Sequence, residues 1–193
     1  MNPVFTVGHS NHPLERFIEL LKLNGVTAVA DVRSQPFSRR NPQFNKERLA
    51  NSLKAEAIAY VFLGRELGAR TDDPTCYEHG QVKYARLAQT ALFRSGIGRV
   101  LEGAKSYQLT LMCAEREPLD CHRTLLVARA LEQRGIAVEH ILKDGEREAH
   151  STTLNRLVKL MHLEGDLFVD AAEQVEAACA LHEAKIAYVK TRS

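Results

Sequence analysis

The 193-residue sequence lacks several features that would place it in a familiar class of protein. It has no apolar run long enough to cross a bilayer, and its N-terminus lacks the charged and apolar regions of a secretory signal peptide. Its four cysteines, at positions 76, 113, 121 and 179, are too irregularly spaced for a disulfide framework in a chain of this length. We therefore expect a cytoplasmic protein that does not associate with membranes.

Two nucleotide-binding signatures are also missing. No Gly-x-x-x-x-Gly-Lys segment follows a predicted strand, and the Gly-x-Gly-x-x-Gly pattern of dinucleotide-binding folds is absent after the first strand. The sequence therefore disfavours ATP and NAD as resident cofactors, and we expect no cofactor. The formal net charge of +2 provides no general attraction to nucleic acid, so such a partner would need a local basic patch.

The sequence does contain short apolar runs that alternate with segments of helical periodicity. Hydrophobic residues make up 45% of the chain, which is enough for a sizeable core. Because alternating strands and helices form parallel sheets covered on both faces, we predict an α/β fold with a Rossmann-like, doubly wound, mostly parallel five-stranded sheet flanked by helices. The expected strands are residues 4–7, 26–32, 58–62, 107–112 and 136–142.

The pattern changes to helices only after Gly145. Residues 153–162 and 170–184 have apolar side chains at helical spacing or an alanine-rich composition. We therefore expect a Rossmann-like α/β domain over residues 1–148, followed by a C-terminal helical extension over residues 149–193 that packs on the same domain. The sequence leaves the oligomeric state open.

The predicted strand order is 3-2-1-4-5, with the first and fourth strands together at the topological switch point, where open α/β sheets bind ligands. The loops after the first, second and fourth strands would then share one crevice. Most of the reactive side chains of the sequence lie on these loops: His9, Ser10, Asp31, Arg33, Cys113, Glu115, Cys121, His122 and Arg123.

Cys121 is the strongest candidate for a nucleophile. It opens a predicted helix that Gly135 ends, and both the helix N-terminus and a neighbouring Arg123 favour the thiolate. His122 or His9 would serve as the base, and Asp31 and Glu115 would transfer protons or orient the other groups. The alternative is that Cys121 is a semi-buried structural thiol. Cys113, at the end of a strand, is more typical of a core thiol.

A metal site is not predicted. Cys113 and Cys121 could form a redox pair or share a metal with a histidine, but seven residues separate them, unlike the CxxC spacing of redox and zinc sites. Cys76 and His79 have a ligand-like spacing, but no second pair accompanies them.

Six arginines fall on or beside the loops at the predicted strand ends and are candidates to bind an oxyanion: Arg33, Arg39, Arg40, Arg65, Arg70 and Arg123. Arg33, Arg39 and Arg123 are predicted to bind an oxyanion, because a guanidinium group can hold an anion through two hydrogen bonds, and Ser10 would contact a ligand oxygen. The alternatives are that some of these arginines pair with neighbouring carboxylates and that Ser10 is only a helix cap.

Several segments in this order resemble the bacterial and archaeal "domain of unknown function 488" family. The matching segments are Thr6-Val-Gly-His-Ser10, Asp31-Val-Arg33 followed by Pro36 and Ser38-Arg39, Leu63-Gly64, Leu111-Met-Cys-Ala-Glu115, Cys121-His-Arg123, His140-Ile141 with Gly145 and, near the end, Asp166-Leu-Phe168 with Tyr188. Arg65 departs from the family, which often has a second glycine there, and this argues against a close backbone approach to a ligand. The resemblance implies a Rossmann-like α/β domain and supplies no established reaction.

We therefore expect a small cytoplasmic enzyme that acts on an anionic substrate, such as a nucleotide, a nucleic-acid component or another phosphate-like molecule, through a Cys/His/Arg site at the carboxyl ends of the strands. The alternative is a non-catalytic nucleotide or nucleic-acid binding module that uses the same crevice. A third hypothesis is nucleic-acid binding through Arg39, Arg40, Lys46 and Arg48, with an affinity that falls steeply with salt.

Overall fold

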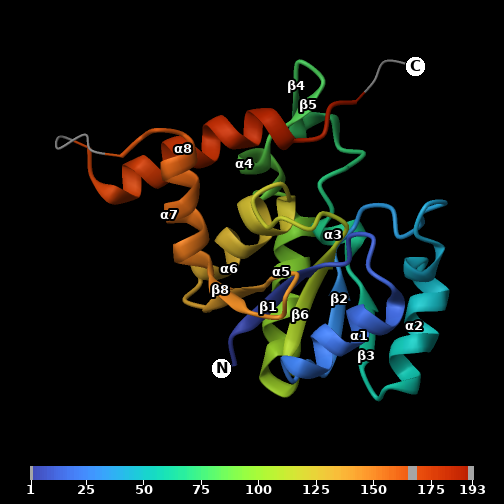
Figure 1. Ribbon diagram of the computed structural model, residues 1–193. Helices are drawn as coiled ribbons and strands as arrows, with labels where there is room; N and C mark the ends of the chain where they lie inside the picture. The colour runs from blue at the N-terminus through green and yellow to red at the C-terminus, as the bar shows by residue number, and fades with distance from the viewer. Residues whose placement is uncertain (1, 165–168, 191–193) are drawn as a thin grey trace.

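The computed structural model describes residues 2–164 and 169–190, and its centre is a six-stranded sheet in the order β3-β2-β6-β1-β7-β8 (Figure 1). Strand β8 runs antiparallel to β7, and the other neighbours in the sheet run parallel. The strands are β1 (Val4–Gly8), β2 (Ala28–Asp31), β3 (Ala59–Phe62), β6 (Leu109–Cys113), β7 (Val138–Ile141) and β8 (Arg147–Ala149).

Helices cover both faces of the sheet because successive strand residues point to opposite sides and both sides are apolar. In β1, Phe5 and Val7 face α1 (Leu14–Leu23) and α2 (Lys46–Ala55), whereas Val4 belongs to the core on the opposite face. The second face is covered by α3 (Gly64–Leu67), α4 (Tyr84–Leu87), α5 (Ala91–Ser106), η3 (Arg123–Ala128), α6 (Arg129–Glu132), α7 (His150–Leu160) and α8 (Ala171–Ile186).

The smaller elements lie in the loops at the carboxyl ends of β2 and β3. They are the 3₁₀ turns η1 (Pro42–Phe44) and η2 (Pro74–Cys76) and an antiparallel hairpin made of β4 (Tyr77–Glu78) and β5 (Gln81–Val82). After α8, the backbone oxygen of Tyr188 accepts a hydrogen bond from Val82, and Val189 forms an isolated bridge with Gln81. The end of the described chain therefore lies against this hairpin.

The predicted mostly parallel sheet flanked by helices is confirmed, but the predicted strand count and order are wrong. Strand β8 is a sixth strand, and β6 lies between β2 and β1, so the five expected strands follow the order 3-2-4-1-5. The connection from β1 to β2 through α1 leaves room for one strand between them. The later connection through α5, on the other face of the sheet, places β6 in that position. Buried strands all read as apolar runs, so the sequence does not distinguish these neighbours.

The C-terminal helices share the core of the sheet. Leu157 of α7 and Cys179 of α8 belong to the same buried cluster as Leu111 of β6, and the expected boundary at residue 148 falls within β8. The Asp166-Leu-Phe168 segment of the family resemblance lies outside the described residues. Within the described part of the chain, no helix is both long and apolar enough to cross a membrane.

Candidate functional site

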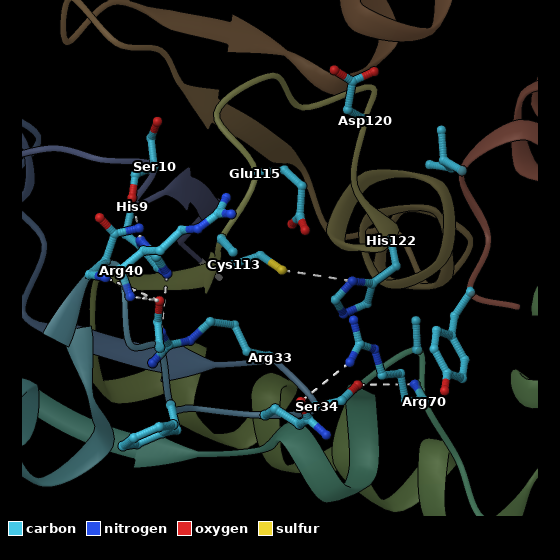
Figure 2. A pocket seen from close by; sticks show the side chains of 18 of the residues that line it. His9, Ser10, Arg33, Ser34, Arg40, Arg70, Cys113, Glu115, Asp120 and His122 are labelled. Carbon is cyan, nitrogen blue, oxygen red and sulfur yellow. Dashed lines mark hydrogen bonds between the residues drawn. The ribbon is translucent and has the colours of Figure 1, made fainter. Parts of the chain in front are cut away.

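A pocket of about 780 Å³ opens at the carboxyl ends of β1, β2 and β6 (Figure 2). Its lining includes His9 and Ser10 after β1, Arg33 and Ser34 after β2, and residues 113–115 at the end of β6. These loops meet because β6 lies between the other two strands. The crevice predicted from the sequence is therefore present, although the strand order that produces it is different.

A cluster of two thiols and one imidazole lies at the floor of this pocket, and two of its three residues, Cys113 and His122, belong to the pocket lining. His122 Nδ1 lies 3.7 Å from Cys113 Sγ and 3.8 Å from Cys121 Sγ. His122 Nε2 donates to the backbone oxygen of Val32 at 3.1 Å, and a carbonyl can only accept, so Nε2 keeps its proton and Nδ1 is the atom that exchanges a proton with the sulfurs. We call Cys113, Cys121 and His122 the floor cluster.

The two thiols of the floor cluster differ in access. Both cysteines are buried, with Cys113 3% and Cys121 1% exposed, but Cys113 lines the pocket with His122 and Cys121 is not among the lining residues. Figure 2 shows the sulfur of Cys113 turned toward the His122 ring. The predicted nucleophile, Cys121, is therefore present in the site but does not face the cavity, because it lies in the turn before η3 rather than on the open strand end.

The pKa values of the two thiols move in opposite directions. Burial raises the pKa of Cys121, but the hydrogen bond with the Cys113 thiol and the charges of Arg123 and His122 outweigh burial and hold that pKa well below the ordinary value. The Arg123 backbone N–H also donates to Cys121 Sγ at 3.4 Å. The hydrogen bond with Cys121 and burial raise the pKa of Cys113. Of the two thiols, Cys121 is therefore the one that loses its proton more readily.

Glu115 extends the floor cluster toward the pocket. Its Oε2 lies 3.0 Å from Cys121 Sγ, and burial, together with the neighbouring Cys121, raises the pKa of this carboxyl. Gly8 permits this arrangement, because a Cβ at that position would lie 1.8 Å from the backbone oxygen of Glu115. The glycine at the end of β1 therefore allows the loop after β6 to approach closely enough to place Glu115 over the sulfurs.

One wall of the pocket contains a buried ion pair. Arg33 Nη2 lies 2.6 Å from Asp31 Oδ2, and the hydroxyl of Tyr60 donates to the same oxygen at 2.7 Å. Asp31 is 0% exposed and Arg33 is 5% exposed. The pair is nearly neutral as a unit, so Asp31 orients Arg33 and most of the guanidinium charge is already compensated.

His9 is not free to act as a base in this arrangement. Its Nδ1 donates to the backbone oxygen of Ser10 at 2.8 Å, so its Nε2 accepts from Arg33 Nη1 at 3.1 Å. Burial and the charge of Arg33 lower the pKa of His9 to about 4. The ring also stacks on Phe44 at 4.3 Å, so His9 is a neutral, fixed part of the wall.

Arg123 and Arg39 do not reach the pocket. Arg123 is completely buried, and its guanidinium donates to the backbone oxygens of Glu115 at 2.7 Å and Arg116 at 3.1 Å, so it holds the loop after β6 from behind. Arg39 is exposed and lies outside the pocket lining. Neither of these two predicted ligand contacts therefore lines the cavity, because one side chain is enclosed by its own loop and the other is outside the cavity.

Two other arginines line the pocket instead. Arg40 has no carboxylate partner among the described residues, and Arg70 contacts Gln35 at 3.3 Å and lies over the ring of Tyr188. The sequence makes Arg40 and Arg70 oxyanion candidates, together with four other arginines on or beside the loops at strand ends, but it favours Arg33 and Arg123 over them. Loop residues have no periodicity from which their direction can be predicted, so only the position of Arg70 near a strand end pointed to it.

The family model described as "Domain of unknown function DUF488" matches residues 13–130, which is well over half of the chain. The match includes the floor cluster and the Asp31–Arg33 pair, and it ends before the C-terminal helices. No curated protein and no solved structure matches this chain.

Proposed function

The chain belongs to the DUF488 family, and we propose that this member is a small cytoplasmic enzyme that acts on an anionic, phosphate-like substrate such as a nucleotide or a nucleic-acid component. One observation carries the proposal: a single pocket has on its wall arginines without carboxylate partners among the described residues, and a thiol, an imidazole and a carboxyl group on its floor. In a Rossmann-like sheet, this carboxyl edge is where ligands bind. Four unpaired thiols suit a reducing compartment.

Arg40 and Arg70 are proposed to bind the anionic part of the substrate. No carboxylate in the described part of the chain pairs with either guanidinium group, in contrast to Arg33, whose charge Asp31 compensates. Hydroxyl groups of Ser10, Ser34 and Ser38 also line the pocket and add hydrogen-bond donors for phosphate-like oxygens. The volume of about 780 Å³ lies in the range of roughly 300–1,000 Å³ of small-molecule sites, which allows a ligand of nucleotide size.

The floor is proposed to carry the chemistry. Cys113 and His122 border the cavity, and Glu115 lies beside them, so a bound substrate would meet a sulfur ligand or nucleophile and two groups that can transfer protons. Cys121 and Arg123 support these groups from behind. His9 orients the wall and takes no part in proton transfer.

The anion-binding part of the proposal is tested with Arg40→Gln and its sequence neighbour Arg39→Gln as the matched control. Binding of inorganic phosphate and of adenosine monophosphate is measured by calorimetry and by the shift in melting temperature. We expect Arg40→Gln to weaken binding by about tenfold or more, because a charge-assisted hydrogen bond contributes about 1.5–3 kcal/mol. Arg39→Gln should change binding less than twofold. Equal losses in both variants, or no binding by the wild type, would refute this assignment.

The catalytic part is tested by incubating the protein with nucleoside mono-, di- and triphosphates and analysing products by mass spectrometry. Cys113→Ser is expected to reduce turnover by at least about a hundredfold, as removal of a group used in the chemical step typically does. Cys179→Ser, which changes a buried thiol of α8 outside the pocket lining, should retain turnover. Binding without any product would favour the non-catalytic binding module over the enzyme.

A further inference from the structure

The floor cluster has the dimensions of a metal site. The sulfurs of Cys113 and Cys121 and a ring nitrogen of His122 lie within 4.8 Å of one another. Zinc in a tetrahedral site binds sulfur at about 2.3 Å and nitrogen at about 2.0–2.1 Å, which places sulfur and nitrogen ligands roughly 3.6 Å apart. The two measured distances, 3.7 and 3.8 Å, are within a few tenths of an ångström of that value.

The ring of His122 is oriented as a metal ligand would be. Its Nε2 donates to the backbone oxygen of Val32 at 3.1 Å, which leaves Nδ1 directed at both sulfurs. Histidines that bind metals usually donate their other ring N–H to a carbonyl or carboxylate, which fixes the ring and its tautomer. A disulfide between the two cysteines would not require the Nδ1 atom of His122 to be directed at both sulfurs.

The surroundings of Cys121 also suit a bound thiolate. The Arg123 backbone N–H donates to its sulfur at 3.4 Å, and the side chain of Arg123 braces the loop that carries Glu115. Two thiolates and a neutral imidazole would balance the charge of a divalent cation, which matters in a site where the three side chains are at most 9% exposed. Nitrogen and sulfur donors of this kind select Zn²⁺ over Mg²⁺ or Ca²⁺.

The fourth position of such a site would open on the pocket. Cys113 and His122 border the cavity, and Glu115 lies next to the sulfurs on that side. Three protein ligands with one open position are typical of catalytic zinc, whereas structural zinc has four protein ligands. The open position would also be next to the arginine wall, where an anionic substrate is proposed to bind.

We infer that Cys113, Cys121 and His122 bind one zinc ion whose fourth position faces the pocket. Binding replaces the protons of the two thiols with the metal and releases them to solvent. The ion would give the floor of the proposed enzyme its reactive centre, so the two sulfurs would be ligands rather than nucleophiles. The inference depends on the geometry of the floor alone, and it can fail while anion binding at Arg40 and Arg70 holds, or hold while anion binding fails.

The test measures zinc on the full-length protein. Protein stripped with a chelator is reconstituted with Zn²⁺, freed of excess metal and analysed by mass spectrometry of the element, with about one ion per chain expected. Cys113→Ser and Cys121→Ser should each lose most of the bound zinc. Cys76→Ser and Cys179→Ser, which change the other two buried cysteines, should keep it. Circular dichroism checks that each variant is folded.

Cobalt substitution of the wild type keeps the inference testable if the serine variants do not fold. Co²⁺ in a site with two thiolates should give a sulfur-to-metal charge-transfer band and tetrahedral ligand-field absorption. Folded wild type that holds no zinc after reconstitution, cobalt protein without the sulfur band, or an intact mass lighter by two hydrogens because of a Cys113–Cys121 disulfide would each overturn the inference. Phosphate binding measured on the same samples separates this result from that of the proposed function.

Discussion

Two buried clusters that contain histidine are linked through Arg123, and they differ in what surrounds their rings. The floor cluster places His122 against two sulfurs at the edge of the pocket. The second group, which we call the sealed pair, consists of His140 and His150, whose rings are joined by an Nε2–Nδ1 hydrogen bond of 3.0 Å. Thr6 connects the two groups, because its hydroxyl accepts from Arg123 Nε at 3.3 Å and contacts His140 Nδ1 at 2.7 Å.

The comparison shows that burial of an ionisable group does not by itself indicate a functional site. Burial lowers the pKa of His140 well below the ordinary value, and burial with the charge of Arg129 lowers the pKa of His150 to about 4, so both rings stay neutral. Burial also acts on His122, but the nearby Cys121 sulfur reverses its effect and raises the pKa. Of the two clusters, only the floor cluster combines the proposed metal ligands with residues that line a cavity.

The largest expected effect comes from breaking the connection between the two groups. Arg123→Met should lower the free energy of unfolding by about 3–5 kcal/mol, because it leaves the backbone oxygens of Glu115 and Arg116 without their buried donors. Urea unfolding measures the loss, and Arg39→Met, which changes an exposed arginine, should stay within about 0.5 kcal/mol. A loss below 1 kcal/mol for Arg123→Met would mean that the loop after β6 does not depend on this residue.

A fall in pH is expected to have an intermediate effect on the free energy of unfolding, through the histidines of the sealed pair. The folded-state pKa of His150, about 4, is below the ordinary value of 6.5, so the unfolded chain takes up the proton first as the pH falls. The stability is therefore complete above pH 6.5 and decreases toward pH 4, by about 3 kcal/mol for this one group.

His150→Gln tests that assignment. Urea unfolding at several pH values between 7 and 4 should show a shallower decrease in this variant than in the wild type, whatever its stability at pH 7. The remaining slope would include His9, whose pKa is lowered in the same direction. Parallel curves for the wild type and the variant would show that His150 takes up its proton as readily in the folded as in the unfolded chain, and the contrast between the two groups would then be lost.

The smallest effect is expected at the wall of the pocket. Tyr60→Phe removes one hydrogen bond to Asp31, which keeps its contacts with Arg33, so the loss of stability should be about 1 kcal/mol. Phosphate binding should change less than twofold, because Arg40 and Arg70 are untouched. A loss of several kcal/mol, or a tenfold loss of binding, would mean that the Asp31–Arg33 pair itself holds the ligand.

The elements of the fold could be predicted from the sequence because they depend on local patterns. Apolar runs mark β1, β6 and β7, and the left-handed Gly135 ends the helix that follows Cys121 and His122, as expected. The position of β6 between β2 and β1 could not be predicted, because the order of buried strands depends on which face each crossover helix covers. Which face a crossover helix covers is determined by how the whole chain packs, so the sequences of the individual strands do not reveal it.

For the site, the sequence by itself determined which loops carry the reactive residues, since those loops follow from the positions of the strands. Only the tertiary structure decided which side chains reach the cavity: Cys113 in front of Cys121, Arg40 rather than Arg39, and Arg123 enclosed behind the loop. The sulfurs and the imidazole come together because a strand end and a helix start converge across an intervening loop. The proximity of these side chains depends on how distant segments pack, so it cannot be predicted from the spacing of residues along the chain.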